Sequence, residues 1–144
     1  MEKISSILAR KGGGAVSVTP GTSVLEALKI MADKNIGSVV VIDQGRYLGI
    51  VSERDYSRKV ILKGKHSSDT PVSEIMSAEL PALSPGDSID QCMTLMTQHN
   101  IRYLPVFEAT QLVGIISMSD VVKATILAQK ETINQLENYI HRQS

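Results

Sequence analysis

Two short segments of this chain place a serine and an aspartate three residues apart, directly after an apolar run. The first is Gly-Ile-Val-Ser-Glu-Arg-Asp, from Gly49 to Asp55, and the second is Gly-Ile-Ile-Ser-Met-Ser-Asp, from Gly114 to Asp120. Apolar residues at helical spacing follow each segment, so each is expected to be a strand-to-helix corner. The hydroxyl and carboxylate can cap that helix. Alternatively, the helix N-terminus and hydroxyl can bind a phosphate, while the carboxylate accepts both hydroxyls of a ribose.

The composition of the chain limits the alternatives. Its 144 residues, 42% of them hydrophobic, can bury one substantial core or two small ones. Fifteen basic and fifteen acidic residues balance, so no overall charge favours nucleic acid or an anionic membrane. Cys92 is the single cysteine, which excludes an intrachain disulfide and a paired-cysteine metal or redox site. The three histidines are scattered without the spacing of metal ligands.

The residue sets of common enzymes are missing from the sequence. It has no Ser-His-Asp or Cys-His constellation, no Walker-type phosphate loop and no metal-spaced cluster. The N-terminus lacks the basic-then-apolar pattern of a signal peptide, and no apolar run approaches the roughly 20 residues that span a bilayer. We therefore expect a non-catalytic cytoplasmic protein without a catalytic cofactor, a metal, a nucleic-acid partner or a membrane partner.

The two corners belong to an internal duplication. A shift of 65 residues aligns the segment from Pro20 to Asp55 with the segment from Pro85 to Asp120, with 11 identities in 36 positions. Both copies match the capping box Ser-x-x-Glu/Gln, at 23–26 and at 88–91, which predicts a helix start. Apolar or β-branched runs predict strands. The predicted strands are 15–18, 38–42 and 47–51 in the first copy, and 103–107 and 112–116 in the second.

This order of elements predicts an α+β fold. Each copy is expected to form a β-α-β-β-α unit whose sheet carries helices on one face and needs a partner for the other. The second copy is the obvious partner. Outside the copies, residues 2–11 predict a short amphipathic helix, 72–76 a short entry helix, and 121–142 a long helix. The long helix carries Ile126 and Ile133 on one side, and we expect its far end to pack on another subunit.

The chain is therefore expected to divide into five segments. These are an N-terminal helix with a glycine linker (1–13), the first repeat (14–63), a linker with the entry helix (64–78), the second repeat (79–128) and a C-terminal helix extension (129–144).

The pattern Gly-hydrophobic-hydrophobic-Ser-x-x-Asp, found twice at a fixed offset, closely resembles the tandem cystathionine-β-synthase (CBS) domain pair. The resemblance runs from about Gly14 to Ile126 and includes the strand Leu104-Pro105-Val106. It implies a stand-alone CBS-domain protein in which two repeats pack sheet to sheet by a pseudo-twofold. It also implies a homodimer, adenine nucleotides bound in two clefts, and a conformational signal passed to a separate regulated protein.

In that family each cleft combines the corner of one repeat with the strand of the other. Carried over, cleft one would contain Ser52, Arg54, Asp55, Arg58, Met76, Ala78, Ile101, Arg102 and Tyr103. Cleft two would contain Lys11, Gly13, Ile36, Gly37, Ser38, Ser117, Ser119 and Asp120. The three arginines of cleft one suit a phosphate, so AMP, ADP, ATP or the adenylate half of NAD(H) is expected to bind more strongly there. Alternatively, Arg54 and Arg58 form an ordinary solvated helix face.

Two functions are therefore open for this sequence. One is a regulatory module that senses adenine nucleotides, and the other is a ligand-free scaffold that dimerises through its helices. Thermal stabilisation by a nucleotide is expected of the first and not of the second.

Overall fold

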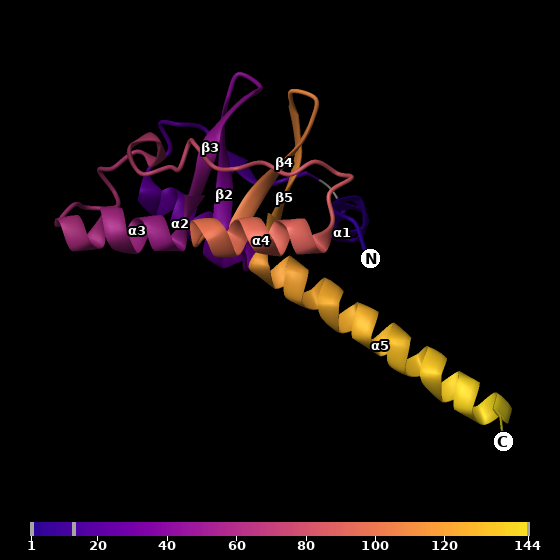
Figure 1. Ribbon diagram of the computed structural model, residues 1–144. Coiled ribbons are helices and arrows are strands. Elements are labelled where there is room, and N and C mark those ends of the chain that lie inside the picture. Colours follow the sequence, from indigo (N-terminus) through magenta and orange to yellow (C-terminus); the bar gives the residue numbers. More distant parts are fainter. Residues whose placement is uncertain (1, 13, 144) are drawn as a thin grey trace. The chain divides into compact units, whose positions relative to one another are not determined.

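The chain folds into two compact units of α+β structure, as seen in a computed structural model that describes residues 2–12 and 14–143 (Figure 1). One unit is Gly13–Pro81 and contains the first copy of the repeat. The other joins Met1–Gly12 to Ala82–Ser144 and contains the second copy. The N-terminal helix α1 (Ile4–Lys11) therefore belongs to the unit of the second copy, although it precedes the first copy in the sequence.

The unit of the first copy has a three-stranded sheet in the order β1-β2-β3. Strand β1 runs parallel to β2, and β2 runs antiparallel to β3. Val39, Val41 and Val51 belong to the core cluster that also contains residues of helix α2, whereas the buried Val40 and Ile50 alternate with them along the strands. The elements are β1 (Ser17–Val18), α2 (Val24–Lys34), β2 (Ser38–Asp43), β3 (Arg46–Ser52), α3 (Glu53–Lys59) and the 3₁₀ turns η1 (Ile61–Lys63) and η2 (Val72–Glu74).

The unit of the second copy has an antiparallel pair of strands, β4 (Tyr103–Glu108) and β5 (Gln111–Ser117), with helix α4 (Ile89–His99) before them. The counterpart of β1 is reduced to one parallel bridge, in which Leu83 donates to Pro105 O at 2.9 Å and accepts from Phe107 N at 2.8 Å. Proline stands two residues before and two residues after Leu83. Because proline has no N–H to donate, the strand cannot extend in the usual ladder.

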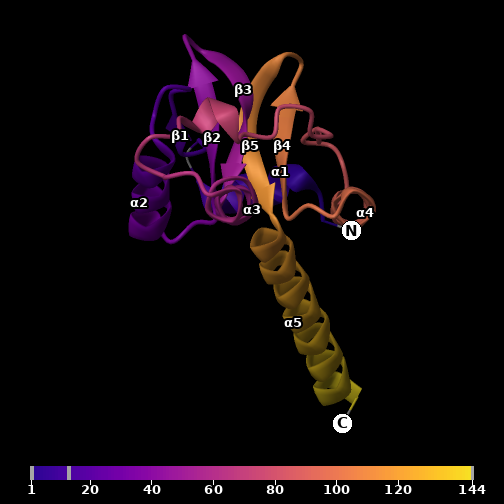
Figure 2. The same cartoon turned by 90° about the vertical axis from the view of Figure 1, so that its left-hand side faces the viewer.

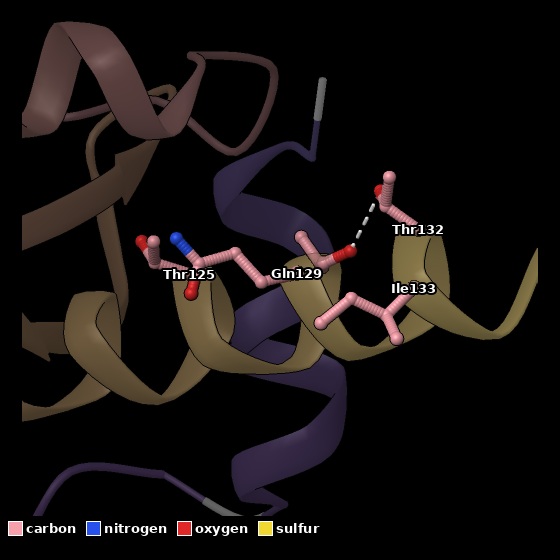
Figure 3. Close-up of a pocket in the computed structure, with 5 residues that line it drawn as sticks. Thr125, Gln129, Thr132 and Ile133 are labelled. Atoms are coloured by element: carbon pink, nitrogen blue, oxygen red, sulfur yellow. Dashed lines mark hydrogen bonds between the residues drawn. The ribbon is translucent and has the colours of Figure 1, made fainter. Parts of the chain in front are cut away.

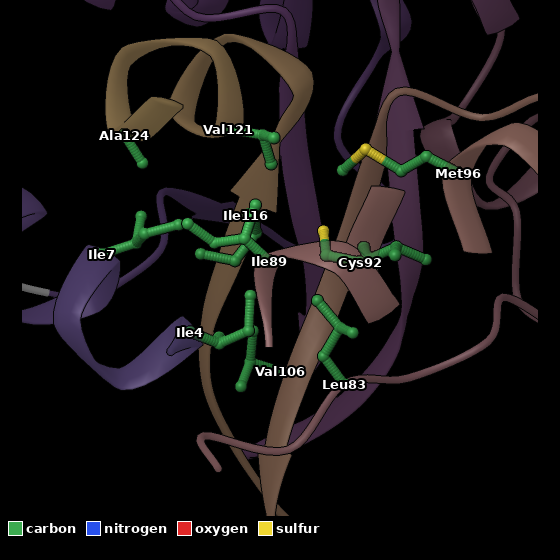
Figure 4. Packing of buried hydrophobic residues seen from close by; sticks show 11 residues of the cluster. Ile4, Ile7, Leu83, Ile89, Cys92, Met96, Val106, Ile116, Val121 and Ala124 are labelled. Atoms are coloured by element: carbon green, nitrogen blue, oxygen red, sulfur yellow. The ribbon is translucent and has the colours of Figure 1, made fainter. Parts of the chain in front are cut away.

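Helix α1 supplies part of the core of this second unit. Ile4 and Ile7 are buried and pack in one cluster with Val106 and Ile116 of the strands (Figure 4). The α1 backbone is also fixed, since Ile4 N donates to Asp87 O at 2.9 Å. Burial of two isoleucine side chains contributes on the order of 3–6 kcal/mol, so α1 is an integral part of the unit.

The helices α2 and α4 begin and end alike. The hydroxyls of Ser23 and Ser88 each accept from the N–H three residues further on, at 3.1 Å. Ser88 N–H also donates to the Gln91 side chain at 2.7 Å, which completes the predicted capping box there; at Ser23 the described hydrogen bonds form only the serine half. Asn35 and Asn100 end the two helices in the left-handed conformation, at φ 54° and 52°.

Helix α5 (Met118–Gln143) begins directly at the second corner and is the long C-terminal helix that the sequence predicts. Val121 and Ala124 are buried in the core, while every residue from Ile126 to Arg142 is exposed. Both Figures 1 and 2 show the helix extending away from β5 after its first turns. No helix in the described part of the chain is long and apolar enough to cross a membrane.

Candidate functional site

The first corner, where β3 meets α3, is a complete capping box. Ser52 N–H donates to Asp55 Oδ2 at 2.9 Å, and Asp55 N–H donates to Ser52 Oγ at 3.2 Å. The Ser52 hydroxyl lies 3.0 Å from the same Asp55 Oδ2 and donates to it. Both residues are buried, with 4% and 7% exposure. The helix-capping interpretation of this Ser-x-x-Asp motif is therefore correct as a description of its local structure.

Lys59 makes further contacts at the first corner. Its ammonium lies 3.1 Å from Asp55 Oδ1 and donates to Ile75 O at 2.9 Å. Both carboxylate oxygens of Asp55 thus have partners within this unit. Sequence reasoning missed Lys59, although an aspartate and a lysine four residues apart on a helix are a known signal for such a pair.

The second corner, where β5 meets α5, repeats the capping bonds. Ser117 N–H donates to Asp120 Oδ2 at 2.8 Å, and Asp120 N–H donates to Ser117 Oγ at 3.2 Å. Here the lysine comes from α1: Lys11 Nζ donates to Asp120 Oδ2 at 2.9 Å and to Ile115 O at 2.7 Å. Both of these bonds to the carboxylate end on Oδ2, and the Ser117 hydroxyl also hydrogen-bonds the carboxylate. A carboxylate has about four lone-pair sites, so that of Asp120 can accept further hydrogen bonds.

Asp120 is charged at neutral pH. Burial by itself would raise the pKa of this carboxyl group. The hydrogen bonds from Ser117 and the nearby Lys11 ammonium outweigh burial, so the pKa lies below its ordinary value. The second corner therefore holds a fixed carboxylate whose side chain is 13% exposed.

The first turns of α3 and α5 use their N–H groups in the same way. Glu53 N donates to Gly37 O at 3.1 Å, and Met118 N donates to Arg102 O at 2.8 Å. The third N–H of each helix donates to the cap serine. Two of the first three N–H groups are thus engaged within the protein at each corner. A phosphate would have to be bound mainly by side chains, rather than by a row of free N–H groups as the sequence motif alone suggested.

The beginnings of β2 and β4 lie beside the corner of their own repeat. Ser38 pairs with Ser52 across the β2–β3 ladder, and Tyr103 pairs with Ser117 across the β4–β5 ladder. A Cβ at Gly37 would lie 3.3 Å from a carboxylate oxygen of Glu53. Each corner therefore lies directly beside the beginning of the neighbouring strand of its own repeat.

The entry segment also lies along β3 of the first corner. Ile50 N donates to Ser77 O at 3.1 Å, and Ser77 N donates to Ile50 O at 2.9 Å. This pairing places the backbone between Met76 and Ala78 beside the strand that ends at Ser52. Gly49 makes it possible, because a Cβ there would lie only 2.7 Å from Ser77 O.

The residues predicted for each cleft are shared between the two units. The unit of the first copy holds Ser52, Arg54, Asp55, Arg58, Met76 and Ala78 of cleft one, and Ile36, Gly37 and Ser38 of cleft two. The unit of the second copy holds Ile101, Arg102 and Tyr103 of cleft one, and Lys11, Ser117, Ser119 and Asp120 of cleft two. Gly13 lies outside the described residues. Within each unit the structure brings a half-site together, and the pairing of half-sites across units stays a prediction.

The charged residues differ between the half-sites. On α3 of the first unit, Arg54 is half-buried and Arg58, one turn later, is exposed. On α5 the corresponding positions are Ser119 and Lys123, both exposed. Arg102, just before β4, is also exposed. In the part of the chain that the structure describes, no group of three or more His, Cys, Asp or Glu could hold a metal ion.

The sequence matches the family model described as the CBS domain, at residues 7–61 and again at 72–126. The CBS domain-containing protein CBSX3, mitochondrial, of Arabidopsis thaliana is 35% identical over 146 residues, covering 95% of this chain and 71% of the relative. The CBS domain-containing protein YhcV of Bacillus subtilis is 34% identical over 122 residues, covering 85% of this chain and 79% of the relative.

Solved structures agree with the fold. A protein with CBS domains from Burkholderia ambifaria MC40-6, described as a candidate signal-transduction protein, superposes with a TM-score of 0.83 at 41% identity, covering 89% of this chain and 96% of that one. The CBS domain pair of MJ0100, solved with 5′-methylthioadenosine and S-adenosyl-L-methionine, has a TM-score of 0.76 at 23% identity, covering 87% and 96% of the two chains.

Proposed function

Because this chain belongs to the CBS-domain family, we propose that it is a non-catalytic regulatory module that binds adenine nucleotides at its two Ser-x-x-Asp corners. On this proposal the ligand joins the corner of one repeat to the strand of the other. The resulting change in the two units is passed to a separate protein. The ligand class is AMP, ADP, ATP or NAD(H).

The arrangement of Asp120 carries this proposal. Its carboxylate is fixed by Ser117 and Lys11, is charged at neutral pH, and accepts the bonds from Ser117 N–H and Lys11 on the same oxygen, Oδ2. The bonds from Ser117 and Lys11 use only part of the acceptor capacity of a carboxylate, which is about four lone-pair sites. Such a group can accept hydrogen bonds from the hydroxyls of a ribose, and these are strengthened by its charge.

The first corner is better suited to a phosphate. Arg54 and Arg58 lie one turn apart on α3, and guanidinium groups bind phosphate through paired hydrogen bonds. Asp55 Oδ1 is already occupied by Lys59, but the side chain of Lys59 is 43% exposed, and a partly exposed pair of this kind contributes only about 0.3–0.5 kcal/mol. A ribose can therefore displace it at small cost. We expect phosphate-bearing ligands to bind more strongly at the first corner than at the second.

A structurally similar protein supports the proposal that the ligand contains an adenosine group. The structurally similar CBS pair of MJ0100 was solved with 5′-methylthioadenosine and S-adenosyl-L-methionine, which share an adenosine group and carry no phosphate. A corner with a ribose-binding carboxylate and little phosphate-binding charge suits such molecules. For this chain we assign that type of ligand to the second corner.

A thermal-unfolding screen tests the proposal. AMP, ADP, ATP, NAD, NADH and S-adenosylmethionine are added singly, and a true ligand at 100 times its dissociation constant stabilises the protein by about 2.7 kcal/mol. 2′-Deoxy-AMP is the matched control, because it keeps the base and phosphate but lacks one of the two hydroxyls that the aspartate would bind. Stabilisation by AMP that is much smaller with 2′-deoxy-AMP supports the proposal; equal shifts contradict the role of the aspartates.

A ligand-free scaffold is the second candidate function. It is favoured by the engagement of both Asp55 oxygens within the first unit, because a carboxylate that caps its helix and pairs with Lys59 needs no ligand to explain it. In that case no adenine ligand shifts the melting temperature, even at millimolar concentration.

A further inference from the structure

An apolar stripe runs along the part of α5 that lies beyond the core. Ile126, Ile133 and Ile140 recur every seven residues, with Leu136 between the last two. Their exposure rises along the helix, from 45% at Ile126 through 53% and 57% to 64% at Ile140. Side chains of this size are normally buried, and a contiguous exposed row of them indicates an interaction surface.

The helix itself needs this surface to be covered. From Ile126 to Arg142 every residue is exposed, so the rest of the unit contributes little packing to this segment. Helices in proteins gain most of their stability from an apolar face that packs on another element. A partner on the stripe would supply that packing.

The spacing of the stripe is that of a coiled coil. With Ile126, Ile133 and Ile140 at the a positions of a heptad, Gln129 and Leu136 fall at d. Apolar side chains at a and d form the seam of a coiled coil, and here Ile126, Ile133, Leu136 and Ile140 supply them, with Gln129 as a polar d residue. This pattern identifies another helix with the same repeat as the natural partner, and a second copy of α5 meets that requirement.

The flanking charges select the direction of the second helix. Lys130 and Glu137 both occupy e positions. In a parallel pair, e residues face g residues, so these two would face Thr125 and Thr132 of the second copy without any charge pairing. In an antiparallel pair, e faces e. Lys130 then lies opposite Glu137 of the second copy, and this pairing occurs twice by symmetry.

The same antiparallel register brings a side chain of the second copy to the edge of a hollow on α5. The hollow has a volume of about 410 Å³ and lies along one side of the helix (Figure 3). The hollow lies beside the seam, because Thr125 and Thr132 occupy g positions of the heptad and Ala128 a c position. With Ile133 opposite Leu136 of the second copy, Tyr139 of that copy comes to the Thr132 edge of the hollow. The lining residues are Thr125, Ala128, Gln129, Thr132 and Ile133.

We propose that two copies of this chain associate through α5 in an antiparallel coiled coil, centred between Asn134 and Gln135. Ile133 of each copy packs against Leu136 of the other, Lys130 pairs with Glu137, and Tyr139 packs at Thr132. The Tyr139 side chain is 62% exposed in the single chain and becomes buried in the pair. This association does not depend on nucleotide binding at the corners.

Charge reversal tests the pairing in the full-length chain, with the dissociation constant measured by sedimentation equilibrium. Lys130→Glu and Glu137→Lys should each weaken self-association by about tenfold or more, because each turns two attractive pairs into repulsive ones. An equimolar mixture of the two variants should associate as tightly as wild type, since all pairs between them are then complementary. The double variant K130E/E137K should also behave as wild type.

A core substitution provides the second arm. Ile133→Asp places a charge in the seam and should abolish this association, whereas Asn134→Asp, at the b position outside the seam, should leave the dissociation constant unchanged. Circular dichroism of each variant checks that the two units stay folded. If the dissociation constants of all variants equal that of wild type, the antiparallel coiled coil is ruled out. Single reversals without effect, combined with a loss for Ile133→Asp, would instead indicate a parallel pair and overturn the proposed direction.

Discussion

Lys11 of α1 donates a hydrogen bond to Asp120 at 2.9 Å, joining two residues that are 109 positions apart in the sequence. The same ammonium donates to Ile115 O at 2.7 Å. One lysine thus ties the N-terminal helix both to the last strand and to the corner aspartate. The proposed ribose-binding group of the second corner is held in place by an element that lies outside the duplicated segments.

Replacement of Lys11 by methionine should make the second unit less stable at neutral pH. We expect a loss of about 0.5–1 kcal/mol at pH 7, kept small because the Lys11 side chain is 39% exposed. The pKa of Asp120 is lower in the folded than in the unfolded chain. Its contribution to stability is therefore present above the unfolded pKa of about 3.9 and is lost as the pH falls through the folded pKa.

The free energy of unfolding in urea, measured at pH 7 and at pH 3, checks this prediction. The difference between wild type and Lys11→Met should be smaller at pH 3 than at pH 7, because protonation of Asp120 weakens the ion pair while the bond to Ile115 O remains. Lys29→Met, at an exposed position of α2, is the control and should have no such pH dependence. A difference for Lys11→Met that is the same at both pH values would contradict the role of the ion pair.

The two corner glycines should differ in their tolerance of alanine. A Cβ at Gly49 would lie 2.7 Å from the backbone oxygen of Ser77, whereas a Cβ at Gly114 would meet only the end of the Leu8 side chain, at 2.6 Å. A leucine side chain can rotate away, but the paired backbone of Ser77 cannot. We expect Gly49→Ala to cost about 2–3 kcal/mol in urea unfolding and Gly114→Ala about 1 kcal/mol or less. Equal losses would contradict this account.

Cys92 should be unreactive in the folded protein. The side chain is fully buried on α4. Burial, with a smaller contribution from the negative charge of Asp120, raises the pKa of the thiol to about 11. At pH 8 a thiol reagent should therefore modify Cys92 only as fast as the unit opens, and at once in denaturing urea. Complete modification of the native protein within the mixing time would contradict the burial of this thiol.

The features that depend on local sequence could be predicted. The capping serines at Ser23, Ser52, Ser88 and Ser117 stand next to the residues that they cap, so a pattern of four residues identifies them. The duplication revealed the shared order of elements. The exposed end of α5 follows from its heptad spacing and its length.

The remaining features depend on contacts between distant segments. No local pattern indicates that α1 packs with the second copy or that Lys11 reaches Asp120, because both depend on tertiary packing. The second copy has only a single bridge at Leu83 in place of a strand like β1. The two flanking prolines explain this, and they are visible in the sequence. The ion pair between Lys59 and Asp55 could also have been predicted from the sequence, since their spacing of four residues is that of a helical ion pair.

Isothermal titration calorimetry with AMP, on wild type and on Asp55→Asn and Asp120→Asn, tests the central claim most directly. Asparagine keeps an oxygen that can cap the helix but removes the charge that would bind the ribose. Wild type should bind AMP, and Asp55→Asn should weaken the tighter site by about tenfold or more. Asp120→Asn should instead chiefly weaken 5′-methylthioadenosine, which carries no phosphate. If wild type gives no binding heat, or if AMP binds both variants as tightly as wild type, the corners are not the nucleotide sites.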